Sequence, residues 1–148
     1  MSNSQTGSQL TAQYTKISFD SAWVLLEQTQ KKAKADGLSV AACVVDATGR
    51  TIAKIVMDGA PLIADELIER KARSALLGLS SQQFGEILSD NVAVRDSMMG
   101  LGELTLLGGG LPIMHDGQML GAYAVGGALV DQDVALAESV LEAFLSNF

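Results

Sequence analysis

Residues 38–57 read LSVAACVVDATGRTIAKIVM, and this stretch predicts a β-hairpin. The first half, Leu38 to Val45, is a short apolar run with the β-branched residues typical of a buried strand. Asp46-Ala47-Thr48-Gly49 has the composition of a turn, and a second strand is expected from Thr51 to Met57. Because hairpins join antiparallel strands, the stretch indicates an antiparallel sheet.

Helices are predicted on both sides of this hairpin. Upstream, apolar residues from Phe19 to Ala33 recur at helical spacing, with Ser18 or Asp20 as the cap, and Trp23 is expected in the core. Downstream, residues 64–78 carry a second apolar stripe. Amphipathic helices of this kind cover the face of a sheet.

The second half of the chain predicts another hairpin and further helices. Asp116-Gly117 is a strong hairpin signal between the apolar runs 111–114 and 118–125. The other expected elements are a helix with a Ser80–Gln83 capping box through Leu88, a loop or broken helix over 90–102, a short strand over 104–107, and a C-terminal helix capped by Asp131. This order predicts an α+β fold, an α/β/α sandwich with a five-stranded antiparallel sheet.

Composition limits the partners. At 148 residues the chain is expected to form one domain over residues 17–148, behind a flexible polar tail over residues 1–16. The net charge of −7 argues against nucleic acid or an anionic membrane as the partner. Hydrophobic residues make up 48% and charged residues only 18%, so apolar surface is expected to be buried between subunits of a homo-oligomer.

Targeting and cysteine signals are sparse. The N-terminal tail has no basic start followed by an apolar segment, and no stretch approaches the roughly 20 apolar residues of a membrane span. We therefore expect a cytoplasmic protein. Cys43 is the only cysteine, and its apolar neighbours predict a buried, unreactive side chain. With one histidine and one cysteine, no zinc site is expected.

Two glycine-marked stretches frame the middle of the chain, residues 56–61 (VMDGAP) and 107–113 (LGGGLPI). Glycine tolerates positive φ and lets another group approach the backbone closely. Between the two stretches lies the predicted helix with its charged residues, Lys71 among them. If the stretches converge, backbone amides and a basic helix border one pocket for a small ligand.

The same stretches carry a family resemblance. The chain from about Ile17 onward resembles the GlcG/HbpS family of haem-binding and proposed haem-degrading domains, which also resemble the C-terminal domain of corrinoid adenosyltransferases. The resemblance implies a profilin-like α/β/α fold, homo-oligomers and possible haem binding. The matching segments, in order, are 44–49, 57–61, 71–75, 108–113, 116–117, 121–122, 126–128 and 132–133.

Candidate site residues follow from the two stretches and their surroundings. Asp58 and Gly59 precede a helix, where backbone N–H groups bind anions, although a plain strand-to-helix turn also accounts for them. Lys71 borders the apolar stripe and is a candidate for holding a carboxylate or haem propionate, or belongs to a solvated charged face. Gly108, Gly109 and Gly110 form an anion-binding nest or a strained loop.

Two further side chains complete the candidates. His115 is a candidate general acid/base or axial haem ligand, or an exposed turn residue. Met98 offers a thioether ligand or a pocket wall, or packs plainly. Three hypotheses remain open: a binding module for haem or a similar flat anionic molecule, an isomerase- or hydrolase-type enzyme in which Lys71, His115 and Asp58 act on a small carboxylated metabolite, and a purely structural assembly module.

Overall fold

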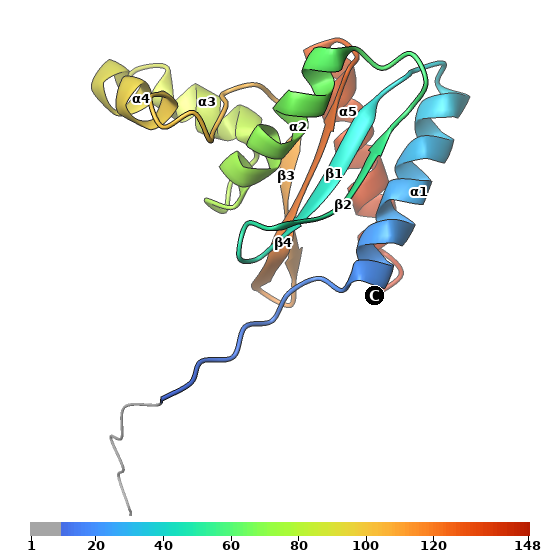
Figure 1. Cartoon of the computed structure of the whole chain (residues 1–148), viewed down its shortest axis with the longest axis horizontal. Coiled ribbons are helices and arrows are strands. Elements are labelled where there is room, and N and C mark those ends of the chain that lie inside the picture. The colour runs from blue at the N-terminus through green and yellow to red at the C-terminus, as the bar shows by residue number, and fades with distance from the viewer. Residues whose placement is uncertain (1–9) are drawn as a thin grey trace, which may run out of the picture.

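The computed structural model describes residues 10–148 as one α+β domain with three layers (Figure 1). Residues 1–9 of the expected tail lie outside the described residues, and residues 10–16 are exposed and carry no helix or strand. The elements are α1 (Phe19–Ala35), β1 (Ala41–Asp46), β2 (Thr51–Val56), α2 (Leu62–Ala75), α3 (Ser81–Leu88), α4 (Val92–Met99), β3 (Gly110–His115), β4 (Gln118–Gly126) and α5 (Val130–Leu145).

The sheet is fully antiparallel and has the strand order β2-β1-β4-β3. Both predicted hairpins are present, β1–β2 and β3–β4, and they are joined through the central pair β1–β4. Because Ala41 pairs with both Val56 and Gly126, β2 and β4 end where β1 begins. The β3–β4 turn therefore lies at the opposite end of the sheet, beside the start of α1 (Figure 1).

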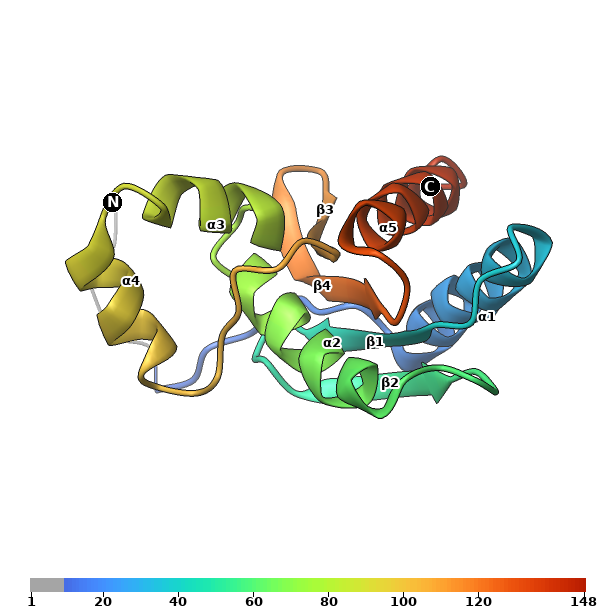
Figure 2. The ribbon, with the colours of Figure 1, turned by 90° about the horizontal axis from the view of Figure 1, so that it is seen from above.

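Each face of the sheet has its own apolar core. Alternate strand residues point to opposite faces, so Val44 and Val125 pack under α1 and α5, while Cys43 and Ala124 pack under α2. Figure 2 shows α2 on one side of the sheet and α1 with α5 on the other. Cys43 is fully buried as expected, and this burial raises the pKa of its thiol to about 12.

The first core also contains a buried polar pair. Thr29 of α1 donates its hydroxyl proton to the carbonyl of Leu25, 2.8 Å away. The hydroxyl of Tyr123 on β4 lies 2.6 Å from the Thr29 hydroxyl and must therefore be the donor of that bond. Every strong polar group of this pair has a partner, which removes the cost of burying it.

The sheet has four strands, so the predicted fifth strand over residues 104–107 is wrong. The reason is that Ser74 of α2 satisfies the backbone that a strand would have paired. The Thr105 N–H donates to the Ser74 hydroxyl at 2.9 Å, and the Thr105 carbonyl lies 2.9 Å from the same oxygen. Residues 104–107 are thus tied to a helix and do not join the edge of the sheet.

Three further expectations are resolved by the structure. Of the two alternatives predicted for residues 90–102, a loop or a broken helix, the structure has the helical one: the short helix α4. The capping box of Ser80 and Gln83 at α3 is confirmed. Asp131 does not cap α5: the cap position is Leu129, whose N–H donates to the Gln132 side chain.

Candidate functional site

The two glycine stretches lie at the same end of the sheet. The loop after β2 holds Gly59, and the loop before β3 holds Gly108 and Gly109, with Gly110 as the first residue of β3. The two stretches therefore flank the central pair β1–β4 from its two sides. They do not contact the same groups. Gly59 faces the Ser39 side chain, whereas Gly109 faces Lys71 and the Val125 carbonyl.

The second stretch needs glycine for steric reasons. A Cβ on Gly109 would lie 2.5 Å from the Val125 carbonyl oxygen, and its φ of +121° already favours glycine. A Cβ on Gly110 would lie 2.1 Å from the Lys71 carbonyl oxygen. These glycines let the chain pass directly against the backbone of α2 at Lys71. The place that a side chain on Gly109 would need is occupied by the Lys71 side chain.

Lys71 reaches from α2 past the end of β4 to the first turn of α5. Its ammonium donates to the Val125 carbonyl at 2.9 Å and to the Asp133 carboxylate at 3.1 Å. Both side chains are 3% exposed. Burial raises the pKa of Asp133 above its usual value, and the charge of Lys71 together with the Ala128 N–H opposes that rise.

At the end of the sheet with the two glycine stretches, here called the glycine end, a negative charge is already present. The N-terminus of α5 favours a negative charge, and Asp133 already supplies one from within the chain. Lys71 already has its carboxylate partner. Sequence reasoning assigned no role to Asp133, although an acidic residue in the first turn of the helix after Gly126-Gly127 was the signal that could have indicated one.

The predicted site residues do not form one constellation. His115 and Gly110 occupy the two ends of β3, five residues and therefore roughly 16 Å apart, so His115 is far from Lys71. Asp58 is exposed and lines a hollow of about 520 Å³ with Lys34. Met98 is half-buried on α4, in the arm formed by α3 and α4 that projects from the sheet (Figure 1).

His115 borders an apolar pocket of about 240 Å³, here called the hairpin pocket. Three chain segments build it: the start of α1, the β3–β4 hairpin and the end of α5. Sequence reasoning missed it because these segments are distant along the chain and the apolar residues of α5 were interpreted as core. Its lining residues are Lys16, Ile17, Ser18, Ser21, Ile113, His115, Leu120, Phe144, Leu145 and Phe148.

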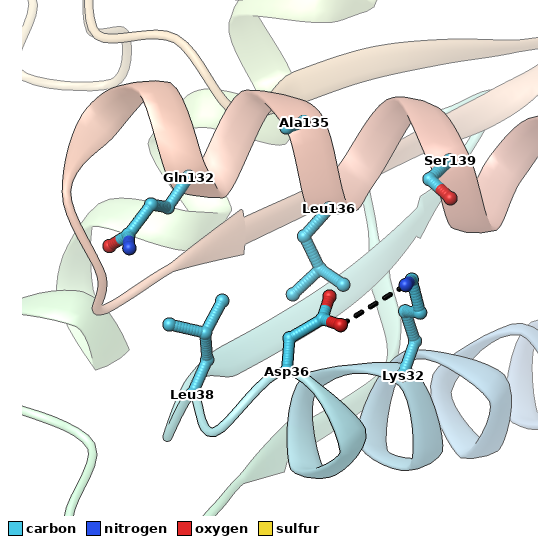
Figure 3. A pocket seen from close by; sticks show the side chains of 7 residues that line it. All are labelled: Lys32, Asp36, Leu38, Gln132, Ala135, Leu136 and Ser139. Carbon is cyan, nitrogen blue, oxygen red and sulfur yellow. Dashed lines mark hydrogen bonds and ion pairs between the residues drawn. The ribbon is translucent and has the colours of Figure 1, made fainter.

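A second pocket of about 360 Å³ lies between α1 and α5 (Figure 3). Its wall on α5 includes Gln132 and Leu136, and Figure 3 shows that the Lys32 ammonium and the Asp36 carboxylate pair with each other across its other side, at 3.1 Å. The side of this pocket on α1 therefore holds an exposed ion pair, with the two side chains 47% and 40% exposed.

The α2 face of the sheet carries a small charge network. Lys54 of β2 contacts Glu69 at 3.0 Å and also pairs with Asp65, both on α2. Hydrogen bonds from Lys54 and Thr51 hold the pKa of Glu69 below its usual value. The described residues contain no group of three or more histidine, cysteine or acidic side chains arranged to hold a metal ion. Among the same residues, no helix is long and apolar enough to cross a membrane.

Comparison with known proteins assigns the family. A sequence model of the family described as "Haem degrading protein HbpS-like" matches residues 17–142. The chain belongs to the HbpS-like family. Protein GlcG of Escherichia coli K12 is 32% identical over 109 residues, which are 74% of this chain and 80% of GlcG.

Solved structures match the fold of this HbpS-like chain. The Klebsiella pneumoniae protein ORFY superposes with a TM-score of 0.84 at 26% identity, covering 94% of this chain and 97% of ORFY. The haem complex of PduOC superposes with a TM-score of 0.80 at 24% identity, covering 87% of this chain and 95% of PduOC. The expected family and its α+β fold with an antiparallel sheet are confirmed.

Proposed function

We propose that this HbpS-like protein binds a small, flat organic molecule with anionic groups, and that haem is the first candidate. The observation that carries the proposal is the similarity of the whole domain to a fold that, in PduOC, was solved as a haem complex. The family description points to the same ligand class.

The residues of this chain fit part of what haem requires. A bound haem would supply an iron that takes an axial ligand, and histidine is the commonest protein ligand. His115 is the only histidine of the chain, and its side chain is 40% exposed beside an apolar pocket. Lys71, the sequence candidate for a propionate, is instead paired with Asp133.

A haemin titration followed by absorption tests the proposal. We expect a saturable shift of the Soret band at a ratio of one haemin per binding site. Human serum albumin as a positive control and an unrelated acidic protein of similar size as a negative control separate specific binding from haemin adsorption. A linear, unsaturated response equal to that of the negative control would contradict haem binding.

The enzyme hypothesis receives less support from this geometry. It requires Lys71, His115 and Asp58 to meet one small substrate. Lys71 and His115 lie near opposite ends of β3, and Asp58 lies beyond β2 on the far edge of the sheet. A binding role requires no such convergence.

We also propose that the protein forms a homo-oligomer through the arm of α3 and α4. None of the eight residues of α4 is buried, and isolated helices shorter than roughly 12–15 residues are marginal in water. Ile87 and Val94 on this arm are 60% and 41% exposed. Light scattering after gel filtration should give a mass above the 15.5 kDa of one chain, and Ile87→Glu with Val94→Glu should lower it. A wild-type mass of one chain would refute the proposal.

A further inference from the structure

The hairpin pocket combines an apolar floor with an open mouth. Its deepest lining residues come from different elements and are almost fully buried: Ile113 of β3, Phe144 of α5 and Ile17 before α1, at 0%, 3% and 4% exposure. Phe148 beyond the end of α5 is 71% exposed at the rim. An apolar ligand body would thus contact buried core side chains below and an exposed aromatic side chain above.

The rim carries one exposed lysine beside a helix N-terminus. Lys16 is 50% exposed, and its ammonium lies 3.9 Å from the carboxylate of Asp46, whose side chain is 5% exposed. At 3.9 Å this contact is too long for a hydrogen bond, so the pair does not use the donors of the ammonium. The start of α1, capped by Ser18, adds the partial positive charge of a helix N-terminus, which Asp20 in the first turn partly offsets. Exposed lysines also border the pocket between α1 and α5 (Lys32) and the hollow beside Asp58 (Lys34), but the lining of neither includes an aromatic side chain.

Aromatic side chains at the rim favour a flat ligand. The rings of His115 and Phe148 meet edge to face with centroids 6.4 Å apart, and Phe144 and Phe148 lie 5.3 Å apart. Such an assembly offers ring faces and edges against which another aromatic ring packs. His115 also contacts Asp116 at 3.3 Å, but Asp116 is 89% exposed and this contact is weak.

The volume limits the size of the enclosed part. At about 240 Å³ the hairpin pocket is smaller than the roughly 300–1,000 Å³ of typical small-molecule pockets. It would therefore enclose a one- or two-ring aromatic acid, or one edge of a larger macrocycle whose remainder stays outside.

We infer that the hairpin pocket is the ligand site and that its ligand is a flat aromatic carboxylate, with Lys16 contacting the carboxylate and His115 contacting the ring system. The inference rests on the proposed function, because it gives the location and the chemistry of the binding proposed above. The two sources of this chemistry are a small aromatic acid and a carboxylate-bearing porphyrin.

The single histidine makes the test direct, since the only imidazole Hε1 signal in a proton NMR spectrum belongs to His115. Wild-type protein is titrated with naphthoate and, separately, with haemin and iron-free protoporphyrin. Lys16→Ala and His115→Ala change exposed side chains and should fold, as thermal melting checks. Lys34→Ala is the matched control, because it removes an exposed lysine beside Asp58 at the other end of the sheet.

The expected result is a saturable shift of the His115 signal by naphthoate, with affinity about tenfold weaker in Lys16→Ala and unchanged in Lys34→Ala, as for the loss of one charge-assisted hydrogen bond. With haemin, His115→Ala should lose the Soret shift but retain protoporphyrin binding.

If haemin binds and both pocket variants bind it equally well, the pocket is wrong while the proposed function stands. If only naphthoate binds, the haem assignment fails and the pocket stands. If naphthoate and protoporphyrin both leave the His115 signal unmoved, the inference is overturned.

Discussion

Replacing Lys71 by methionine should destabilise the protein strongly without preventing it from folding. The variant keeps a side chain of similar length but leaves the Asp133 carboxylate 3% exposed and without its cation. Removing one partner of a buried ion pair costs roughly 3–5 kcal/mol, a large part of the roughly 5–15 kcal/mol that stabilises a typical domain. Urea denaturation followed by far-UV circular dichroism measures this loss.

The double variant Lys71→Met with Asp133→Asn tests whether the loss comes from the uncompensated charge. Asparagine can still accept the Ala128 N–H, and no charge is left buried. The double variant should therefore be more stable than Lys71→Met alone. Lys32→Met is the control: it breaks the exposed pair with Asp36, which contributes no more than about 0.5 kcal/mol.

The pH dependence gives a third readout. Burial raises the pKa of Asp133 and Lys71 opposes the rise, so removing Lys71 should raise this pKa further. A carboxyl whose folded-state pKa exceeds its unfolded value stabilises the fold below the unfolded pKa, and this contribution is lost as pH rises through the folded pKa. Lys71→Met should thus regain stability on acidification from neutral pH. A loss below about 1 kcal/mol, or a double variant less stable than Lys71→Met, would refute this reasoning.

Three other changes should have smaller effects. Thr29→Val should lower the free energy of unfolding more than Tyr123→Phe in urea denaturation. Thr29→Val leaves the buried tyrosine hydroxyl without an acceptor, at a cost of about 1–3 kcal/mol. Tyr123→Phe leaves Thr29 its bond to the Leu25 carbonyl. Ser74→Ala should increase amide hydrogen exchange over residues 100–109, because the Thr105 N–H loses its acceptor; unchanged exchange would contradict this. The lowered pKa of Glu69 means that its ionised carboxylate stabilises the fold above the unfolded-state pKa, and this stabilisation is lost as pH falls through the folded-state pKa. Glu69→Gln removes this contribution, so the variant should lose less stability than the wild type on acidification below about pH 5.

The sequence predicts the elements of this fold better than their packing. Both hairpins, the first and last helices and the Ser80 capping box depend on local patterns, and these are confirmed. The fifth strand fails because Ser74, some thirty residues away, takes up the Thr105 backbone. Trp23 fits the helical stripe of α1 but is 41% exposed and stacks on Phe19, since periodicity does not show where a neighbouring element ends.

The candidate site shows the same limit. That Gly109 and Gly110 have a special role could be inferred from three consecutive glycines. What they accommodate could not, because Lys71 and Asp133 are 62 residues apart and meet only after α2 and α5 have packed on opposite faces of the sheet. A charge beside an apolar stripe is compatible with a ligand site and with an internal ion pair, and the spacing of residues along one helix does not distinguish them.

The internal ion pair also bears on where a ligand can bind. At the glycine end, the α5 N-terminus, Lys71 and Asp133 satisfy one another, and an external anion there would have to compete with a carboxylate held by the fold itself. At the hairpin end, the half-exposed Lys16 lies 3.9 Å from the buried Asp46 carboxylate, which is beyond hydrogen-bond distance, and His115 contacts the exposed Asp116. Binding free energy comes from groups that gain partners on binding, because groups already paired gain little. The glycine stretch before β3 therefore positions α2, β3 and α5, and the site that we propose for a flat anionic ligand lies at the opposite end of the sheet.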